Sequence, residues 1–338
     1  MRVAVFDTHR YDRESFDAVN VRYGHELRYF EPRLTADTVA LAAGFPAVCS
    51  FVNDRVDAAA LGGLRDGGVR LVALRSAGYN QVDLGAAARL GLRVVRVPDY
   101  SPHAVAEHTV GLVLALDRSI HRAHDRVRDG NFSLEGLVGF DLYGKTVGIV
   151  GLGRIGRVVA RIFHGFGCRL LASERQPVPD LGPELPVRLV ERAELYRESD
   201  IITLHVPLTP ETHHLIDEGA LAQMKPGVLI VNTGRGALID TRALIEALKA
   251  GRVRAAGLDV YEEEEGVFFQ DLSDSVLKDD VLARLLTFPN VIVTAHQAFL
   301  THEALAAIAD TTLANVTAFE QGRPLQHEVT PAITTGRP

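Results

Sequence analysis

The sequence predicts an α/β protein of two domains, each built on a doubly wound parallel sheet. Three observations lead to this prediction. Short runs rich in β-branched residues alternate with stretches of helical periodicity along almost the whole chain. The 338 residues exceed the length that one hydrophobic core usually supports. Hydrophobic residues at 47% and charged residues at 23% are typical of a globular protein.

The first hundred residues contain five predicted strands and their connecting helices, enough for one small doubly wound domain. Two of these helices are expected over Tyr11–Tyr23 and Val82–Leu90, and Gly24 and Gly91 follow them as stop signals. The strands are expected at Val3–Phe6, Glu26–Phe30, Ala47–Phe51, Val69–Arg75 and Arg93–Val97.

A second domain is expected to begin near Ser101, because Ser101-Pro102 has the pattern of an N-cap followed by proline at the first helical position. An apolar helix follows to about Leu116, and the stretch His121–Ser133 is polar. The last predicted helix covers Thr301–Glu320. Between them six further strands are expected at Thr146–Val150, Arg169–Ser173, Ile201–Val206, Val228–Asn232, Ala256–Val260 and Val291–Thr294.

Charge and cysteine content restrict the class of protein. With 36 basic against 43 acidic residues, the formal charge of −7 argues against a nucleic-acid-binding surface. No apolar run is long enough to span a bilayer, and the N-terminus lacks the basic flank and cleavage site of a signal peptide. Cys49 and Cys168 lie in apolar stretches and are expected to be reduced and buried, as in a cytoplasmic protein.

A glycine-rich turn provides the first chemical signal. Gly151-Leu152-Gly153-Arg154-Ile155-Gly156 directly follows the predicted strand Thr146–Val150 and opens a helix with apolar residues at helical spacing. Gly151 would allow the tight turn, Gly153 would let a pyrophosphate approach the backbone, and Gly156 would let the helix pack close to the strand. The helix N-terminus would present N–H groups and its dipole to the anion. This context predicts a dinucleotide site.

The acidic residue at the end of the next strand favours NAD as the dinucleotide. Glu174 lies 18 residues after Gly156, where a carboxylate accepts hydrogen bonds from ribose hydroxyls and repels a 2′-phosphate. Arg175 follows at once and would pair with a 2′-phosphate if it turned inward, so some use of NADP stays open.

Polar residues follow three of the later predicted strands. Arg235 lies in Asn232-Thr233-Gly234-Arg235-Gly236, Asp259 ends another strand, and His296 follows a third. Because open α/β sheets bind ligands at the carboxyl ends of their strands, these residues are expected to converge on one crevice. An arginine flanked by glycines suits a bidentate grip on a carboxylate better than it suits packing. The pattern leaves open whether His296 is functional or satisfied in the core.

Together these segments resemble the D-isomer-specific 2-hydroxyacid dehydrogenases and, within them, the NAD-dependent D-lactate dehydrogenases. The resemblance spans nearly the whole chain and implies a flavodoxin-like substrate domain, residues 1–100 plus 300–338, and a Rossmann NAD domain, residues 101–299, with the active site in the cleft. The matching motifs are the glycine turn, the Arg235 segment, Asp259-Val260-Tyr261-Glu262-Glu263-Glu264, His296-Gln297-Ala298-Phe299, Arg75-Ser76-Ala77-Gly78-Tyr79-Asn80, Val97–Pro102, Asn131–Gly136 and Val267-Phe268-Phe269.

The resemblance also implies roles for individual residues. Arg235 would bind the carboxylate of pyruvate, His296 would be the acid and base, and Glu264 would orient the imidazole. Of the run Glu262 to Glu265, the family pattern selects Glu264, and the other three are expected to be solvated. Substrate contacts are expected from Ala77, Gly78, Tyr100, Phe51 and Phe299. Cofactor contacts are expected from Gly151, Gly153, Arg154, Ile155, Gly156, Glu174, Val206, Pro207, Thr212, Thr233, Gly234, Arg235 and Asp259.

No metal site is predicted. His121 and His124 are spaced like a metal pair but lack an acidic or cysteine partner, and His213-His214 is expected at the surface. The predicted activity is reversible reduction of pyruvate to D-lactate with NADH by a cytoplasmic homodimer or higher oligomer. The alternatives are another 2-oxo acid, such as hydroxypyruvate, glyoxylate or phenylpyruvate, and a non-catalytic NAD-sensing regulator.

Overall fold

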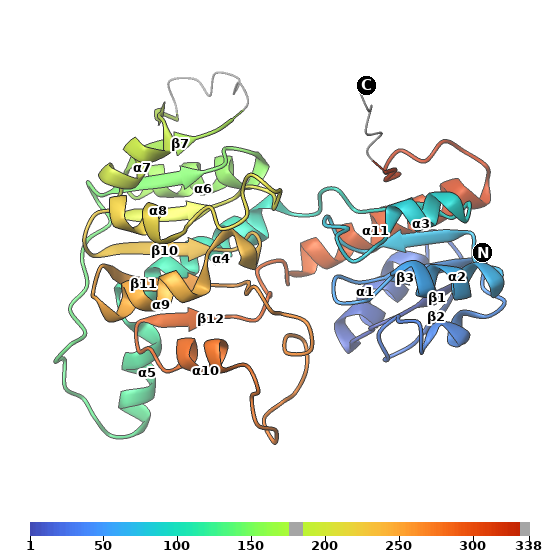
Figure 1. Ribbon diagram of the computed structural model, residues 1–338, viewed down its shortest axis with the longest axis horizontal. Helices are drawn as coiled ribbons and strands as arrows, with labels where there is room; N and C mark the ends of the chain where they lie inside the picture. The colour runs from blue at the N-terminus through green and yellow to red at the C-terminus, as the bar shows by residue number, and fades with distance from the viewer. Residues whose placement is uncertain (176–184, 332–338) are drawn as a thin grey trace. The chain divides into compact units, whose positions relative to one another are not determined.

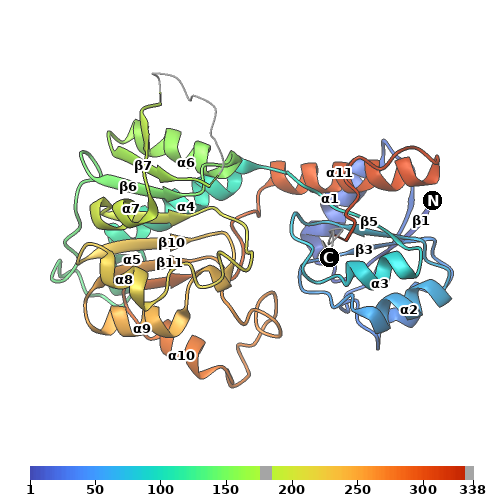
Figure 2. The same ribbon diagram turned by 45° about the horizontal axis from the view of Figure 1, so that its top comes forward.

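The computed structural model describes residues 1–175 and 185–331, and the chain divides into two compact units (Figures 1 and 2). Unit 1 comprises Met1–Ser101 and Leu300–Pro338, and unit 2 comprises Pro102–Phe299. The last seven residues of the predicted range 300–338 lie outside the described residues.

Unit 1 is a five-stranded parallel sheet in the order β2-β1-β3-β4-β5, which is the order of flavodoxin-like folds. The interior strands β3 and β4 are buried at every position because helices cover both faces of the sheet. All five predicted strands are confirmed; β1 begins one residue earlier than predicted, and the other four are shorter than predicted. They are β1 (Arg2–Val5), β2 (Glu26–Tyr29), β3 (Ala47–Ser50), β4 (Leu71–Leu74) and β5 (Arg93–Val95).

The helices of unit 1 form two layers around this sheet. Helix α1 (Arg10–Asn20) packs with α11 (His302–Glu320) on one face, through Phe16, Leu313 and Val316 among others. Helices α2 (Ala58–Asp66) and α3 (Leu84–Arg89), with the short η1 (Val39–Ala42), belong to the core of the other face. The C-terminal helix is therefore an integral part of the N-terminal fold, as Figure 2 shows.

Unit 2 is a seven-stranded parallel sheet in the order β12-β11-β10-β9-β6-β7-β8. The chain starts in the middle at β6, moves outward through β7 and β8, and then returns to β9 on the other side of β6. The point between β6 and β9 is the topological switch point, where doubly wound sheets bind ligands. The strands are β6 (Thr146–Val150), β7 (Arg169–Ser173), β8 (Val187–Leu189), β9 (Ile201–Leu204), β10 (Val228–Asn232), β11 (Val253–Leu258) and β12 (Val291–Val293).

Helices cover both faces of this second sheet (Figure 1). On one face, α4 (Pro102–Asp117) packs against α6 (Arg154–Gly165) and β11. Gly257 permits this approach, since a Cβ there would lie 3.1 Å from the Cβ of Leu112. The other face carries α7 (Arg192–Glu198), α8 (Glu218–Gln223), α9 (Thr241–Lys249) and α10 (Asp280–Leu286).

Three elements of unit 2 depart from the sequence prediction. Strand β11 begins at Val253 and ends at Leu258, whereas Ala256–Val260 was expected. Strand β8 was missed because it has three residues at the sheet edge and two of them are exposed. Helix α5 (Ile120–Arg128) forms within the stretch described only as polar, and none of its residues is buried. Its helical pattern was hard to recognise because its two large apolar residues, Ile120 and Val127, are half exposed rather than packed on a core.

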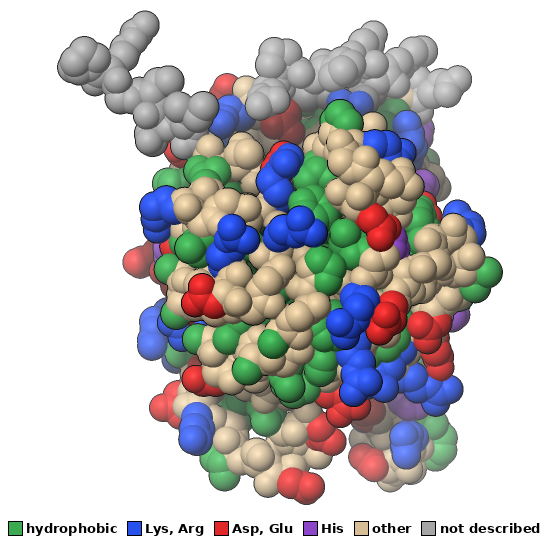
Figure 3. Space-filling view, turned by 90° about the vertical axis from the view of Figure 1, so that its right-hand side faces the viewer, with side chains coloured by type: hydrophobic (Ala, Val, Ile, Leu, Met, Phe, Trp, Pro, Cys, Tyr) green, Lys and Arg blue, Asp and Glu red, His purple; other side chains and the backbone are tan. Residues whose placement is uncertain are grey.

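Two other expectations concern the distribution of surface charge and the absence of membrane-spanning segments. Acidic and basic side chains are interspersed over the face in Figure 3, so no single-sign patch dominates it. Within residues 1–175 and 185–331, every helix is too short or too polar to cross a membrane.

Candidate functional site

The glycine turn after β6 has the geometry that a bound pyrophosphate requires. Gly151 has φ of +95°, and a Cβ there would lie 2.7 Å from the carbonyl oxygen of His205. A Cβ on Gly156 would collide with the carbonyl of Gly151. Gly153 is different: it is the N-cap of the 12-residue α6, and a Cβ there would meet no described atom within 4 Å. The backbone is thus tight behind the turn and open at the helix N-terminus, where an anion binds.

Glu174 lies against this turn. Its Oε2 accepts a hydrogen bond from the N–H of Leu152 at 2.8 Å, and its Oε1 accepts one from the N–H of Arg175 at 2.9 Å. The carboxylate is therefore held at the carboxyl ends of β6 and β7, next to the open end of α6. This position fits a ribose whose pyrophosphate lies at Gly153. Arg175 is exposed.

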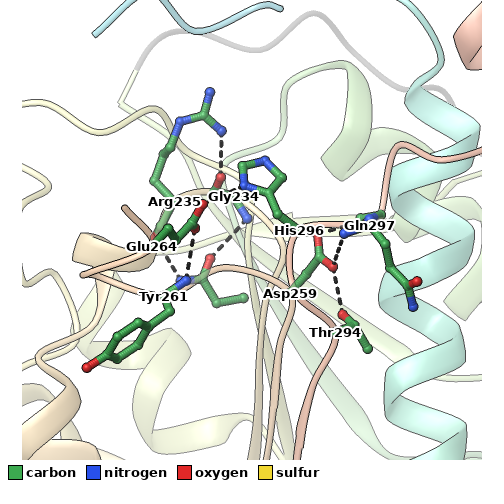
Figure 4. Close-up of polar contacts among 10 residues, drawn as sticks. Gly234, Arg235, Asp259, Tyr261, Glu264, Thr294, His296 and Gln297 are labelled. Carbon is green, nitrogen blue, oxygen red and sulfur yellow. Dashed lines mark hydrogen bonds and ion pairs between the residues drawn. The ribbon is translucent and has the colours of Figure 1, made fainter. Parts of the chain in front are cut away.

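The turn that carries Arg235 is closed by Asn232, the last residue of β10. The Asn232 side chain donates to the carbonyl of Arg235 at 2.8 Å and accepts from the N–H of Gly234 at 3.0 Å. The Arg235 guanidinium donates to the carbonyl of Gly234 at 2.7 Å (Figure 4). Asn232 is 1% exposed, so the base of the turn is rigid while its arginine is only half-buried.

Asp259 organises the turn after β12 that carries His296. Its carboxylate is 1% exposed and accepts three hydrogen bonds, from Thr294 Oγ1 at 2.6 Å, Gln297 N–H at 2.8 Å and Ala298 N–H at 3.0 Å (Figure 4). These contacts hold Ala295 and His296 at φ of +50° and +62°, a left-handed conformation that non-glycine residues adopt only when the surroundings impose it.

His296 and Glu264 form a hydrogen-bonded pair. The Nδ1 of His296 lies 2.7 Å from Glu264 Oε2, and Glu264 Oε1 accepts from the N–H of Tyr261 at 3.0 Å. The two side chains are 19% and 17% exposed, so the pair is largely shielded from water. Because Nδ1 is occupied, Nε2 is the ring nitrogen left to serve a ligand. Figure 4 shows Arg235, Glu264 and His296 rising on the same side of the strand ends.

A family model described as the NAD-binding domain of D-isomer specific 2-hydroxyacid dehydrogenases matches residues 110–298. The chain belongs to this family. It is 52% identical over 330 residues to a D-lactate dehydrogenase of Escherichia coli, covering 97% of this chain and 100% of that one. It is also 52% identical to 2-hydroxyacid dehydrogenase homolog 1 of Schizosaccharomyces pombe, covering 94% and 96% of the two chains.

A solved structure has the same fold as this chain. The apo-structure of D-lactate dehydrogenase from Escherichia coli superposes with a TM-score of 0.90 at 50% identity and covers 98% of this chain and 100% of that one. The protein is accordingly an NAD-dependent 2-hydroxyacid dehydrogenase built from two parallel-sheet α/β units, as the sequence predicted.

The other predicted cofactor residues of this dehydrogenase are placed as follows. Val206 and Pro207 follow β9, and Val206 lies beside Gly151. The hydroxyl of Thr212 donates to the carbonyl of Pro207 at 2.7 Å and accepts from Thr209 N–H at 2.8 Å, so it closes its own loop. The hydroxyl of Thr233 lies 2.9 Å from that of Thr109 in α4. The hydroxyls of Thr212 and Thr233 thus form hydrogen bonds within the protein.

Four of the five predicted substrate residues lie in unit 1, and two of them, Ala77 and Gly78, lie in the turn that follows strand β4. The carbonyl of Ala77 accepts from Arg96 and that of Gly78 accepts from Ser76 Oγ, each at 2.8 Å. Neither N–H group of the two donates to an acceptor in the described part of the chain. Tyr100 is half-buried.

A buried arginine supports this turn and the predicted pocket residue Phe51. Arg75 is 1% exposed, donates to the carbonyls of Phe6 and Asp7, and lies 4.4 Å from the centre of the Phe51 ring. Asp54 accepts from the N–H of Phe51 at 2.7 Å, and burial raises the pKa of this carboxyl to about 6. Phe51 is 4% exposed, and Phe299, the last residue of unit 2, is 8% exposed.

One sequence expectation about the run of glutamates was wrong. Glu262 is not solvated, because its Oε1 lies 2.6 Å from Nε2 of His214 and its Oε2 accepts from the N–H of Thr241 at 2.8 Å. His214 is 34% exposed, so it lies at the surface as expected, with Glu262 as its partner. Glu262 was assigned to solvent because a run of glutamates usually is. Glu263 and Glu265 are exposed as expected.

Sequence reasoning also missed the supporting role of several residues. Asn232 appeared only as part of a motif, yet its side chain closes the Arg235 turn. The ring of Phe269 lies with its centre 5.8 Å from that of His296. His121 and His124 both lie on α5; Nε2 of His121 lies 3.2 Å from the carbonyl oxygen of Pro289, and His124 is exposed. Among the described residues, no group of three potential ligands is arranged for a metal ion.

Proposed function

We propose that this dehydrogenase is an NAD-dependent D-lactate dehydrogenase that reduces pyruvate to D-lactate, and that it also catalyses the reverse reaction. The observation that carries the chemistry is the His296–Glu264 pair at 2.7 Å beside the Arg235 turn. The identity of 52% with a D-lactate dehydrogenase of Escherichia coli supports the choice of substrate.

Arg235 would bind the substrate carboxylate. Its planar fork of N–H donors matches the two oxygens of a carboxylate, and the Asn232 side chain keeps the turn below it in place. We assign to the N–H groups of Ala77 and Gly78 a second contact with the same carboxylate. Tyr100, Phe51 and Phe299 would form pocket walls that favour a small substrate over a bulky one.

His296 would transfer the proton. In pyruvate reduction its Nε2–H protonates the carbonyl oxygen, and in lactate oxidation the neutral Nε2 removes the hydroxyl proton. Glu264 accepts from Nδ1–H, which sets the tautomer and stabilises the imidazolium. Asp259 holds the left-handed turn that aims the ring, so its main contribution here is positioning. Its expected contact with the nicotinamide amide stays a prediction.

The cofactor would supply the hydride that is added to the ketone carbon. Gly151, Gly153 and Gly156, with Arg154 and Ile155, would hold its pyrophosphate, and Glu174 its adenosine ribose. Val206 and Pro207 would lie near the adenine. The turn Thr233-Gly234-Arg235 would lie near the nicotinamide, and Thr212 would act by shaping the loop. NAD is favoured over NADP as the cofactor, because the carboxylate of Glu174 would repel a 2′-phosphate.

The test is NADH oxidation with pyruvate, together with NAD reduction by D-lactate and L-lactate in separate assays and a parallel run with NADPH. Fast turnover of pyruvate and reduction from D-lactate alone are expected. Faster turnover of hydroxypyruvate, glyoxylate or phenylpyruvate would replace the substrate. Tight NADH binding without turnover of any 2-oxo acid would favour the regulator.

We further propose a homodimer formed through unit 2. Helix α5 buries none of its residues, and the segment that follows it exposes apolar side chains. Phe132 is 75% exposed, Leu134 80% and Val138 86%. We call helix α5 and the segment that follows it, residues 120–138, the arm. A row of exposed apolar side chains such as this one is typical of a surface that binds another protein chain. A cytoplasmic location is proposed on the two free, buried cysteines.

A further inference from the structure

The backbone at Tyr261 and Glu262 is a junction between several parts of the candidate site. A Cβ on Gly236 would collide with the carbonyl of Tyr261, so the Arg235 turn packs directly on this backbone. The hydroxyl of Tyr261 donates to Asp279, the N-cap of α10, at 2.8 Å. The N–H of Tyr261 donates to Glu264, the partner of His296. Any movement here would disturb both Arg235 and Glu264.

The carboxylate of Glu262 ties two further elements to this junction. Its Oε2 accepts the N–H of Thr241, the first residue of α9, at 2.8 Å. This N–H has no partner within its own helix, so Glu262 satisfies one of the open donors at the helix N-terminus. Its Oε1 lies 2.6 Å from His214 Nε2, and the side chain is 22% exposed.

His214 belongs to the loop after β9 that contains Val206, Pro207 and Thr212. It has φ of +49°, and its N–H donates to the carbonyl of Ala237 at 2.8 Å. Two residues later, Ile216 N–H donates to the carbonyl of Leu238 at 2.9 Å. The end of this loop is therefore fixed to the backbone that follows Arg235, and the imidazole reaches across to Glu262.

We propose that His214 and Glu262 are a positioning pair that couples the cofactor-side loop after β9 to the segment bearing Glu264. The proposal rests on the proposed function for the roles of that loop and of Glu264. The pair touches none of the reacting groups. It acts by keeping Glu264 and the Arg235 turn in place, and by keeping Val206 and Pro207 next to the glycine turn.

Two carboxylates and one imidazole lie next to the ring of His214. Glu262 faces it from the segment after β11, and Asp240, the N-cap of α9, has Oδ2 at 4.0 Å from its Nδ1. The neighbouring ring of His213 stacks on it at 4.0 Å between centres. His213 is itself exposed, and of the two histidines only His214 forms an ion-pair contact with Glu262 or Asp240 in the described part of the chain. His213 therefore provides a matched control for substitution of a histidine in this loop.

The first experiment measures the Kd for NADH by fluorescence and kcat for pyruvate in five variants, one of which is Glu262→Ala alone. His214→Ala is expected to raise the Kd and lower kcat, each about 3- to 10-fold, as for the loss of one partly screened charge-assisted contact. His214→Gln should recover most of both, because its amide can still donate to Glu262. His213→Ala should match the parent. The double variant with Glu262→Ala should be no worse than the poorer single variant.

A second experiment uses the cofactor-free protein, so that its result does not depend on the substrate. Amide hydrogen exchange at Thr241 should accelerate in both His214→Ala and Glu262→Ala. Exchange at Ala243, whose N–H donates to Asp240 at 3.0 Å, should not change. A thermal melt records any global destabilisation of each variant.

Unchanged exchange at Thr241 in His214→Ala would overturn the coupling. So would a lower Tm with the NADH Kd and kcat of the parent, or strictly additive effects in the double variant. If the parent protein binds NADH but does not turn over pyruvate, the proposed function fails, while the Kd and exchange measurements still decide the role of the pair.

Discussion

Replacing Glu264 with glutamine tests the assignment of the acid–base pair most directly. The Glu264→Gln change would retain the size of the side chain and its contact with Tyr261 N–H, but it would remove the negative charge 2.7 Å from His296 Nδ1. The change therefore isolates the electrostatic support of the imidazolium from the packing of the loop.

The magnitude follows from the kind of contact that is lost. A hydrogen bond to a charged group is worth about 1.5–3 kcal/mol, and about 1.4 kcal/mol corresponds to tenfold in rate. Both side chains are less than one-fifth exposed, so water would replace little of the contact. We therefore expect kcat for pyruvate reduction to fall between about 10- and 100-fold.

The assay is pre-steady-state oxidation of NADH by pyruvate across a range of pH, with the Kd for NADH measured separately. The Kd should change little. The pH above which pyruvate reduction declines should move down, because the protonated imidazole has lost its carboxylate partner. Glu263→Gln is the matched control, since it removes the same charge from an exposed neighbour.

Equal rates in Glu264→Gln and Glu263→Gln, with the same pH profile as the parent, would refute the reasoning. The imidazole would then depend on some other group, and the short contact between Glu264 and His296 would have only a structural role.

The remaining predictions concern the substrate, the proton, acid stability and assembly. His296→Gln should bind NADH normally and lose about 10²–10⁴-fold in turnover, and near-normal turnover would exclude it as the acid. Arg235→Lys should raise the KM for pyruvate about 10- to 100-fold because a point charge replaces a bidentate fork, and an unaltered KM would make the arginine structural. Burial lowers the pKa of His205 from 6.5 to about 3, so the unfolded chain binds its proton first and stability should fall by about 1.4 kcal/mol per pH unit as the pH drops through that window. His205→Gln should flatten this dependence in denaturant titrations, and an unchanged slope would assign acid lability to other groups. Leu134→Asp should shift the sedimentation of the protein toward a monomer while Val276→Asp, at a residue 87% exposed elsewhere in unit 2, should not; identical sedimentation of both would exclude this arm from the interface.

Several parts of the fold were readable in the sequence because they depend on local pattern. The buried strands β6 and β10 were predicted with the residues that the structure gives them. The glycine turn after β6 was recognised from its spacing, and the positive φ of Gly151 and the crowding at Gly156 show why two of its glycines are required. Strand β8 and helix α5 were missed, since neither buries a regular apolar face.

The residues of the candidate site also fall into two groups, those that the sequence pattern identified and those that it did not. Arg235 and His296 were identifiable as polar residues following buried strands, whose carboxyl ends meet at one edge of a parallel sheet. Pattern alone did not distinguish the four glutamates from Glu262 to Glu265. A family resemblance pointed to Glu264, and the contacts of Glu262 could not be foreseen from either source.

The sequence by itself determined the fold class, the dinucleotide turn and the strand ends at which charged residues would gather. These features follow from side-chain periodicity and from the conformational freedom of glycine, which act over a few residues. Only the tertiary structure decided that Glu264 reaches His296, that Glu262 reaches His214, and that Asp259 supports the His296 turn. In a loop, the direction of each side chain depends on backbone angles that distant contacts impose, as the left-handed Ala295 and His296 show.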